Sequence, residues 1–92
     1  MIKHYNIIVQ GKVQGVNYRA SAKQMALLLS VNGFVCNMAN GDVYAEIEGD
    51  ENLLTKFIQW CHHGPGNAYV KYVSVQEDVV QGFKSFEIQE NR

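Results

Sequence analysis

The 92-residue chain lacks several features that mark specialised classes of protein. It has no run of about 18 apolar residues and no apolar signal-peptide segment, so we expect neither a membrane span nor export. Its two cysteines, Cys36 and Cys61, do not have the Cys-x-x-Cys spacing of zinc and redox sites. A net charge of −1 argues against broad affinity for nucleic acid. These absences favour a cytoplasmic protein that binds neither nucleic acid nor a membrane.

Acidic residues are absent from residues 1–41, although the chain as a whole is slightly acidic. This half contains four basic residues, whereas residues 42–92 contain four basic and nine acidic ones. The first half is therefore electropositive and is expected to attract an anion. Internal repeats and low-complexity segments are also absent, and 92 residues provide one modest core. We therefore expect a single domain over residues 1–92.

Hydrophobic periodicity predicts a strand and then a helix at the start of the chain. Residues 3–10 alternate between two faces, as in a half-buried strand. From Ala20 to about Val31, apolar residues recur at spacings of three and four among residue types that favour helix. The dipeptide Asn32-Gly33 is predicted to end this helix.

The middle of the chain predicts a β-hairpin. Residues 34–39 and 42–48 flank Asn40-Gly41, a dipeptide that favours a tight turn because both residues tolerate positive φ. Alternation along the second of these strands predicts one face directed at the core and one at solvent. The expected core residues are Val43, Ala45 and Ile47, and the expected solvent-facing residues are Tyr44, Glu46 and Glu48.

The rest of the chain predicts a second helix and two further strands. Asp50 is a plausible N-cap for a helix that ends before Gly64-Pro65. Strands are predicted at residues 69–75 and at residues 85–89. The resulting order of elements predicts an α+β, ferredoxin-like split βαβ sandwich, with an antiparallel sheet and both helices on one of its faces.

A glycine-punctuated segment, residues 9–19, connects the first predicted strand to the first predicted helix. Backbone N–H groups at a helix N-terminus carry partial positive charge and bind anions. Arg19 lies beside these groups in the sequence, and a planar guanidinium binds two oxygens at once. The segment therefore predicts a cradle for a phosphate.

Two motifs of the chain resemble the signatures of a known family. The motif GxVQGVxYR at residues 11–19 is similar to the first signature of the acylphosphatase family, and GFVCN at residues 33–37 resembles the second. Three residues depart from the family pattern: Tyr18 where phenylalanine is usual, Cys36 where a long side chain is common, and Gly66 where proline often occurs.

The resemblance implies an enzyme that hydrolyses the carboxyl–phosphate anhydride bond of small acyl phosphates, without a metal and without a covalent intermediate. The residues agree with this chemistry, since phosphoryl transfer depends on positioning and on charge stabilisation. Arg19 would bind the phosphoryl oxygens with two N–H groups, while backbone amides of the loop surround them. The expected phosphate-binding residues are Gly15, Val16, Asn17, Tyr18 and Arg19.

Asn37 would hold the attacking water, because an amide both donates and accepts hydrogen bonds without titrating. The predicted catalytic residues are thus Arg19 and Asn37. No cluster of His, Cys, Asp or Glu with ligand spacing accompanies the loop, so we expect neither a metal nor another cofactor. Inorganic phosphate or sulfate should occupy the loop, and we expect the protein to be a monomer.

Other functions of the same fold remain open at this point. One is a non-catalytic module that binds anions or acyl phosphates. A second is a relative of the acylphosphatase-like domain of larger carbamoyl-transfer proteins, against which the short chain argues. A third is a module that binds single-stranded RNA, but the expected strand of alternating glycines and aromatics with basic flanks is missing.

Several side chains have a structural role as their simplest interpretation. Tyr18, Phe34 and Trp60 are expected to pack in the core or at its rim. Cys36 and Cys61 are expected to lie on opposite sides of the sheet and to remain unbridged, because Cys36 alternates with Val35 whereas Cys61 lies on the apolar face of the second helix. Free thiols fit a reducing cytoplasm.

Overall fold

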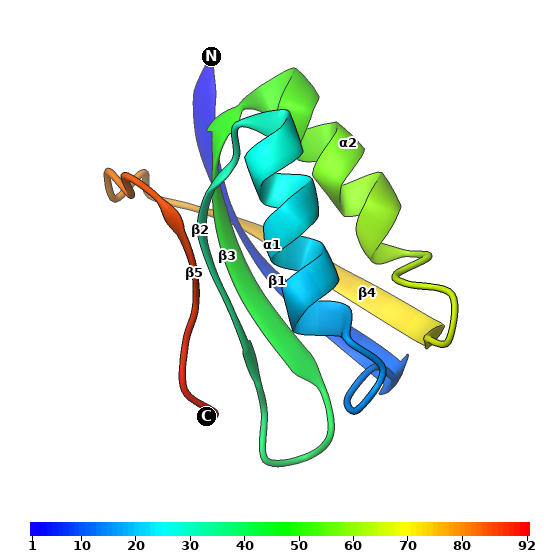
Figure 1. Ribbon diagram of the computed structural model, residues 1–92. Helices are drawn as coiled ribbons and strands as arrows, with labels where there is room; N and C mark the ends of the chain where they lie inside the picture. Colours follow the sequence, from blue (N-terminus) through cyan, green and yellow to red (C-terminus); the bar gives the residue numbers. More distant parts are fainter.

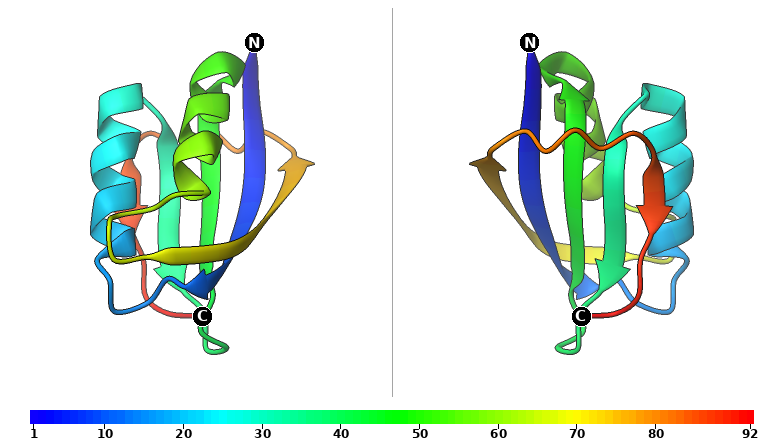
Figure 2. Two further views of the ribbon diagram at one scale, coloured as in Figure 1. Left: turned by 90° about the vertical axis from the view of Figure 1, so that its right-hand side faces the viewer. Right: turned by 90° about the vertical axis from the view of Figure 1, so that its left-hand side faces the viewer.

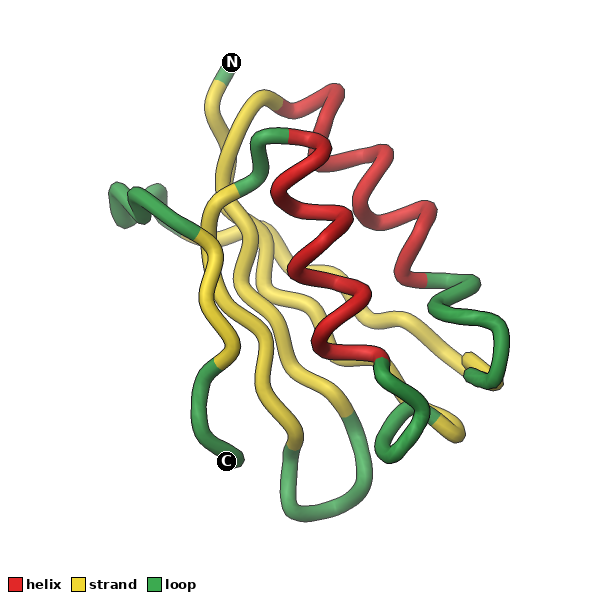
Figure 3. The backbone as a smooth tube through the Cα atoms, viewed as in Figure 1, coloured by secondary structure: helices red, strands yellow, loops and turns green.

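The computed structural model describes all of residues 1–92. Figure 1 shows two helices packed side by side on one face of a sheet, as expected for the ferredoxin-like α+β fold. Figure 3, coloured by secondary structure, separates the helical layer from the strand layer. The elements are β1 (Ile2–Lys12), α1 (Tyr18–Leu29), β2 (Asn32–Asn37), β3 (Val43–Asp50), α2 (Glu51–Cys61), β4 (Tyr69–Asp78) and β5 (Phe86–Ile88). Neither helix has the length and apolar content needed to cross a membrane.

The sheet has the strand order β4-β1-β3-β2-β5. Strand β1 pairs antiparallel with β3 and β4, and β2 pairs antiparallel with β3. The prediction of an antiparallel sheet is wrong for one pair, because β5 runs parallel to β2. Residues 79–85 cross from the β4 edge to the β5 edge over the face that carries no helix (Figure 2). This crossing brings the chain to the end of the sheet at which β2 begins. Strand β5 therefore runs in the same direction as β2.

The predicted end of the first helix is also wrong. Helix α1 stops at Leu29 because Ser30 adopts a left-handed conformation, with φ 56° and ψ 41°. The N–H groups of Ser30 and Val31 then donate to carbonyls of the last turn, which satisfies the helix end. Gly33 belongs to β2 instead. A Cβ at Gly33 would lie 1.8 Å from the carbonyl oxygen of Glu46, so only glycine permits β3 to approach this closely.

The core lies between the helices and the sheet. The predicted core residues of β3 are all buried in it, together with side chains from every other element except β4, whose Val70 and Val73 pack against it partly buried. The largest fully buried side chains on this face include Phe57, Leu54, Ile7 and Ile47. Cys61 belongs to this core, whereas Cys36 is buried on the other face of the sheet, and both thiols are free as predicted.

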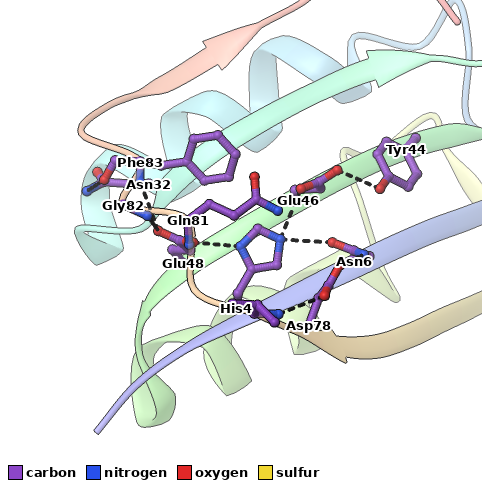
Figure 4. A network of polar contacts seen from close by, with 11 residues as sticks. His4, Asn6, Asn32, Tyr44, Glu46, Glu48, Asp78, Gln81, Gly82 and Phe83 are labelled. Atoms are coloured by element: carbon purple, nitrogen blue, oxygen red, sulfur yellow. Dashed lines mark hydrogen bonds and ion pairs between the residues drawn. The ribbon is translucent and has the colours of Figure 1, made fainter.

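A buried polar network covers the other face of the sheet near the start of β1 (Figure 4). His4 has no exposed surface, and its Nδ1 lies 2.8 Å from Oε2 of Glu48. Its Nε2 lies 2.9 Å from Oδ1 of Asn6 and 3.0 Å from Oε1 of Glu46. Since Asn6 uses its Nδ2 to donate to Asp78, its oxygen is the atom that faces the ring.

Glu48 connects this network to the crossing segment, residues 79–85. Its carboxylate accepts backbone N–H bonds from Gln81, Gly82 and Phe83, and the ring of Phe83 stacks on His4. The prediction that Glu48 faces solvent is therefore wrong, because the crossing segment covers this end of the strand and leaves Glu48 only 4% exposed. The same network holds the connection that leads into β5.

The geometry around His4 requires a charged ring. All its partner atoms are acceptors, so both ring nitrogens must carry a proton. Burial lowers the pKa of His4, but its hydrogen bonds to Glu48 and Asn6 and the nearby carboxylate charges outweigh burial and raise the pKa above its ordinary value. Burial likewise raises the pKa of Glu48, yet the backbone N–H bonds and the imidazolium hold that pKa below its usual range.

We expect this network to make stability depend on pH. Because the pKa of His4 is raised in the folded state, its stabilisation is complete below about pH 6.5 and is lost as pH rises through the folded pKa. The variant His4→Gln keeps one amide donor but cannot titrate. Chemical denaturation should show the natural protein to be about 1–3 kcal/mol more stable than His4→Gln near pH 6, with less than half that difference near pH 9.

The exposed histidines at the end of α2, His62 and His63, are present in both proteins and cancel in this comparison. A difference in the free energy of unfolding that stays constant across this range, or grows with pH, would contradict a charged His4.

Candidate active site

A pocket of about 330 Å³ lies where the start of α1, the end of β2 and strand β5 meet. Five of the six predicted site residues line it, with four neighbours. The lining residues are Val13, Gln14, Gly15, Asn17, Tyr18, Arg19, Ala20, Asn37 and Ile88. Val16 is the exception among the predicted residues, since it is absent from the lining and its side chain packs against the core. The fold therefore brings the two signature motifs to one place.

The loop before α1 owes its shape to two left-handed residues. Gly15 has φ 73° and Asn17 has φ 67°, a conformation that glycine and asparagine adopt at the least cost. Asn17 is the N-cap of α1, but its side chain makes no capping hydrogen bond. The first N–H groups of a helix have no partner within the helix, so those of α1 remain available to a ligand.

Arg19 lies in the first turn of α1 and is partly buried. It is the only lining residue with a charged side chain. No carboxylate pairs with its guanidinium, and no protein group accepts a hydrogen bond from it. The donors of this guanidinium are therefore unused by the protein itself.

Asn37 is the last residue of β2 and is only 9% exposed. Its Oδ1 is buried and has no hydrogen-bond partner. Leaving a buried acceptor unsatisfied costs about 1–3 kcal/mol, so such atoms in folded proteins call for an explanation. Asn37 lines the same pocket as Arg19, so the fold places its side-chain amide beside any ligand of that pocket.

Gln14 is a residue whose part in the site the sequence did not reveal. Its side-chain Nε2 donates to the carbonyls of Met38 and Asp42, each at 2.8 Å. These two carbonyls belong to the β2–β3 connection, directly after Asn37. The amide of Gln14 therefore joins the loop before α1 to the segment that carries Asn37. Gln14 belongs to the first motif, but the motif does not indicate which groups its side chain would hydrogen-bond.

The predicted aromatic residues pack structurally, as expected. Tyr18 is 2% exposed, and its hydroxyl donates to the carbonyl of Cys61 at the end of α2, which raises the pKa of Tyr18 together with burial. Its ring lies against Trp60, 5.1 Å between centroids. The hydroxyl that distinguishes Tyr18 from phenylalanine thus holds the first turn of α1 to α2. Phe34 packs on the opposite face of the sheet, beneath Arg92.

Cys36 precedes Asn37 but faces the other side of the sheet. It has no exposed surface, and burial raises its pKa even though the charges of Arg92 and Arg19 oppose this. A protonated thiol on the far face is no nucleophile for a ligand in the pocket. No group of three or more His, Cys, Asp or Glu side chains is close enough to hold a metal ion.

Comparison with known proteins agrees with the two motifs. A family model described as Acylphosphatase matches residues 5–88. An acylphosphatase from Syntrophus aciditrophicus is 42% identical over 89 residues, which cover 96% of this chain and 93% of the relative. The structure of an acylphosphatase from Coxiella burnetii has a TM-score of 0.93 at 32% identity, covering 96% of this chain and 93% of that one.

The fold also occurs inside a longer protein. Full-length HypF, in its phosphate- and nucleotide-bound form, matches 99% of this chain with a TM-score of 0.91 and 29% identity, yet this match covers only 12% of HypF. The match of the family model over most of the residues, together with relatives of similar length, decides the assignment. The chain belongs to the acylphosphatase family.

Proposed function

We propose that this protein hydrolyses small acyl phosphates to a carboxylate and inorganic phosphate, with Arg19 and Asn37 as its catalytic residues. One observation carries the assignment of residues: a single pocket contains a guanidinium that pairs with no protein group and a buried amide oxygen that lacks a partner. The family assignment supports the reaction. The reaction in turn explains both unused groups.

Arg19 and the loop bind the phosphoryl group. The planar guanidinium donates two parallel N–H bonds to two of its oxygens. The N–H groups of residues 15–19 add partial positive charge at the helix start, where no side chain caps them. The charge that spreads over the equatorial oxygens in the transition state is thereby stabilised by groups that need not move.

Asn37 positions the attacking water. Its side-chain amide hydrogen-bonds that water and aims the water's lone pair at phosphorus. The water oxygen forms a bond to phosphorus as the bond from phosphorus to the acyl oxygen breaks, and the electron pair leaves with the carboxylate. Since a carboxylate is a good leaving group, the site needs no strong general acid or base.

We further propose that catalysis uses no metal and no covalent intermediate. Arg19 and the helix start supply the positive charge that a divalent ion supplies in many phosphotransferases. The pocket lining contains no His, Cys, Asp, Glu, Ser or Thr that could attack phosphorus. We also propose a cytoplasmic monomer, and the two free thiols fit a reducing cytoplasm.

Binding without turnover is the alternative that the same pocket permits. A module of this kind would use Arg19 and the loop but would not need the water-binding group. The unpartnered oxygen of Asn37 favours hydrolysis, because a module that only binds an anion gains nothing from an acceptor beside it. Assaying benzoyl phosphate hydrolysis distinguishes the two functions.

The variants Arg19→Ala and Asn37→Ala should separate binding from chemistry. Arg19→Ala should weaken phosphate binding and lower kcat, and Arg19→Lys should not restore either, since an ammonium cannot make the two-pronged contact. Asn37→Ala should bind phosphate nearly as well as the natural protein while kcat falls by about 10²-fold or more, on the order of 3 kcal/mol. Phosphate inhibition constants and kcat for acetyl phosphate measure both effects.

Two residues outside the pocket provide matched controls, Lys23→Ala on α1 and Asn52→Ala on α2, and neither should change kcat or phosphate binding. Each variant is checked for thermal stability. The water-positioning role of Asn37 must be abandoned if Asn37→Ala retains full turnover or loses phosphate binding as severely as Arg19→Ala.

Chelation should leave activity unchanged. The protein dialysed against EDTA is expected to keep its kcat, and added magnesium or zinc should raise it less than about twofold, because the pocket offers a cation no carboxylate, thiolate or imidazole. Phosphate and sulfate should inhibit competitively. Loss of activity on chelation, with recovery on adding either metal, would show that the charge balance proposed here is wrong.

The variant Gln14→Ala should affect water placement more than anion binding. Without the two bonds to Met38 and Asp42, the loop and Asn37 lose their fixed separation. We expect kcat to fall by about tenfold or more, because displacement on the ångström scale is costly in catalysis. The phosphate inhibition constant should change by less than about threefold.

Gln24→Ala is the control for this experiment, since Gln24 is an exposed glutamine of α1. Equal losses of kcat and phosphate affinity in Gln14→Ala would indicate collapse of the loop, and unchanged kcat would show that the bridge is dispensable.

A further inference from the structure

Ile88, on the short edge strand β5, is the one lining residue that comes from the end of the chain. We propose that Ile88 forms the wall against which the acyl group of the substrate packs, and that the protein prefers acyl phosphates with an uncharged aromatic or branched acyl group. This inference rests on the proposed hydrolysis of acyl phosphates. It concerns the acyl group, which is the part of the substrate that the loop before α1 does not bind.

The sheet register places Ile88 beside the reacting centre. Strand β5 runs parallel to β2 with Ile88 opposite Val35, which is fully buried beneath the helices. Partner residues in a pair of strands share a face, so Ile88 also lies on the helix side. Asn37 follows Val35 by two residues and lies on that same face. Ile88 and Asn37 therefore lie on one face of the β2–β5 pair, two positions apart in register, and both line the pocket with Arg19.

Ile88 is the most exposed of the large apolar residues that line the pocket. Four lining residues are apolar or aromatic, namely Val13, Tyr18, Ala20 and Ile88. Val13 and Tyr18 are only 1% and 2% exposed, and Ala20 offers a single methyl group. Ile88 is 42% exposed, so a ligand in the pocket can reach its side chain. Covering this surface with an apolar acyl group is favourable.

The size and charge of the pocket restrict the acyl group further. The volume of about 330 Å³ falls within the range of pockets that bind small organic ligands, roughly 300–1,000 Å³. Arg19 is the only charged lining residue, and the phosphoryl group uses it. A carboxylate or an ammonium in the acyl group would therefore lose water without gaining a partner. An aromatic ring or a branched chain meets no such cost.

Benzoyl phosphate and acetyl phosphate test this wall directly, since they share the anhydride and differ in the acyl group. The natural protein should have a higher kcat/KM for benzoyl phosphate. In Ile88→Ala, kcat/KM for benzoyl phosphate should fall by about 5- to 20-fold, whereas that for acetyl phosphate should change by less than about twofold. The phosphate inhibition constant should not change, because Ile88 lies outside the loop.

Val75→Ala is the matched control, because Val75 is β-branched, 41% exposed and on the opposite edge strand, β4. It should leave the ratio of the two kcat/KM values unchanged. Ile88→Thr serves as a second variant that keeps a β-branched side chain in β5 but makes it polar, and it should lower the ratio in the same direction.

The outcomes distinguish a failure of the proposed role of Ile88 from a failure of the proposed hydrolysis. If the natural protein hydrolyses both substrates but the ratio of kcat/KM is the same in both Ile88 variants, the acyl wall is wrong and the proposed function stands. If neither substrate is hydrolysed while phosphate still binds, the proposed function fails, and the inference about Ile88 fails with it.

Discussion

The side-chain amide of Gln14 donates to the carbonyls of Met38 and Asp42, and these two hydrogen bonds join the two segments from which the candidate site is built. Neither the loop before α1 nor the segment around Asn37 forms the candidate site alone. The loop presents a guanidinium and helix N–H groups, and the β2–β3 connection presents an amide oxygen, from segments separated by a complete helix. A flexible tether would leave their separation variable, whereas an amide bonded to two backbone carbonyls fixes it. Catalysis by positioning requires such a fixed separation.

The sequence predicts those parts of the fold that follow from the hydrophobic pattern of neighbouring residues. It does not predict contacts between segments that are distant in the sequence. Alternation along residues 42–48 correctly assigns the core face of β3, since Val43 and Ile47 are fully buried. The same pattern fails for Glu48, because a segment more than thirty positions later covers it and donates three N–H groups to it. The parallel pairing of β5 fails for a related reason. Strand direction depends on the path of residues 79–85 across the sheet, which periodicity does not encode.

The site shows the same division between local and distant information. Arg19 and Asn37 were predicted as catalytic residues because each belongs to a continuous motif whose residue types suit phosphate chemistry. The structure brings both to one pocket, and their roles stay a prediction. The unpaired state of the Asn37 oxygen is a property of packing, so no motif reports it. Ile88 was predictable as a strand residue but not as a lining residue, since its place depends on the register between β5 and β2. The acyl group is therefore the part of the substrate about which the sequence says least.

In the proposed reaction the site directs a water molecule at phosphorus instead of at the carbonyl carbon of the acyl phosphate. Hydrolysis of benzoyl phosphate in water enriched in the heavy oxygen isotope tests it most directly, with mass spectrometry of both products and subtraction of the enzyme-free reaction. Attack on phosphorus breaks the bond between phosphorus and the acyl oxygen, so the account predicts one labelled oxygen in inorganic phosphate and none in benzoate. Label in benzoate would contradict the account, because it would mean that Arg19 and Asn37 surround the wrong atom.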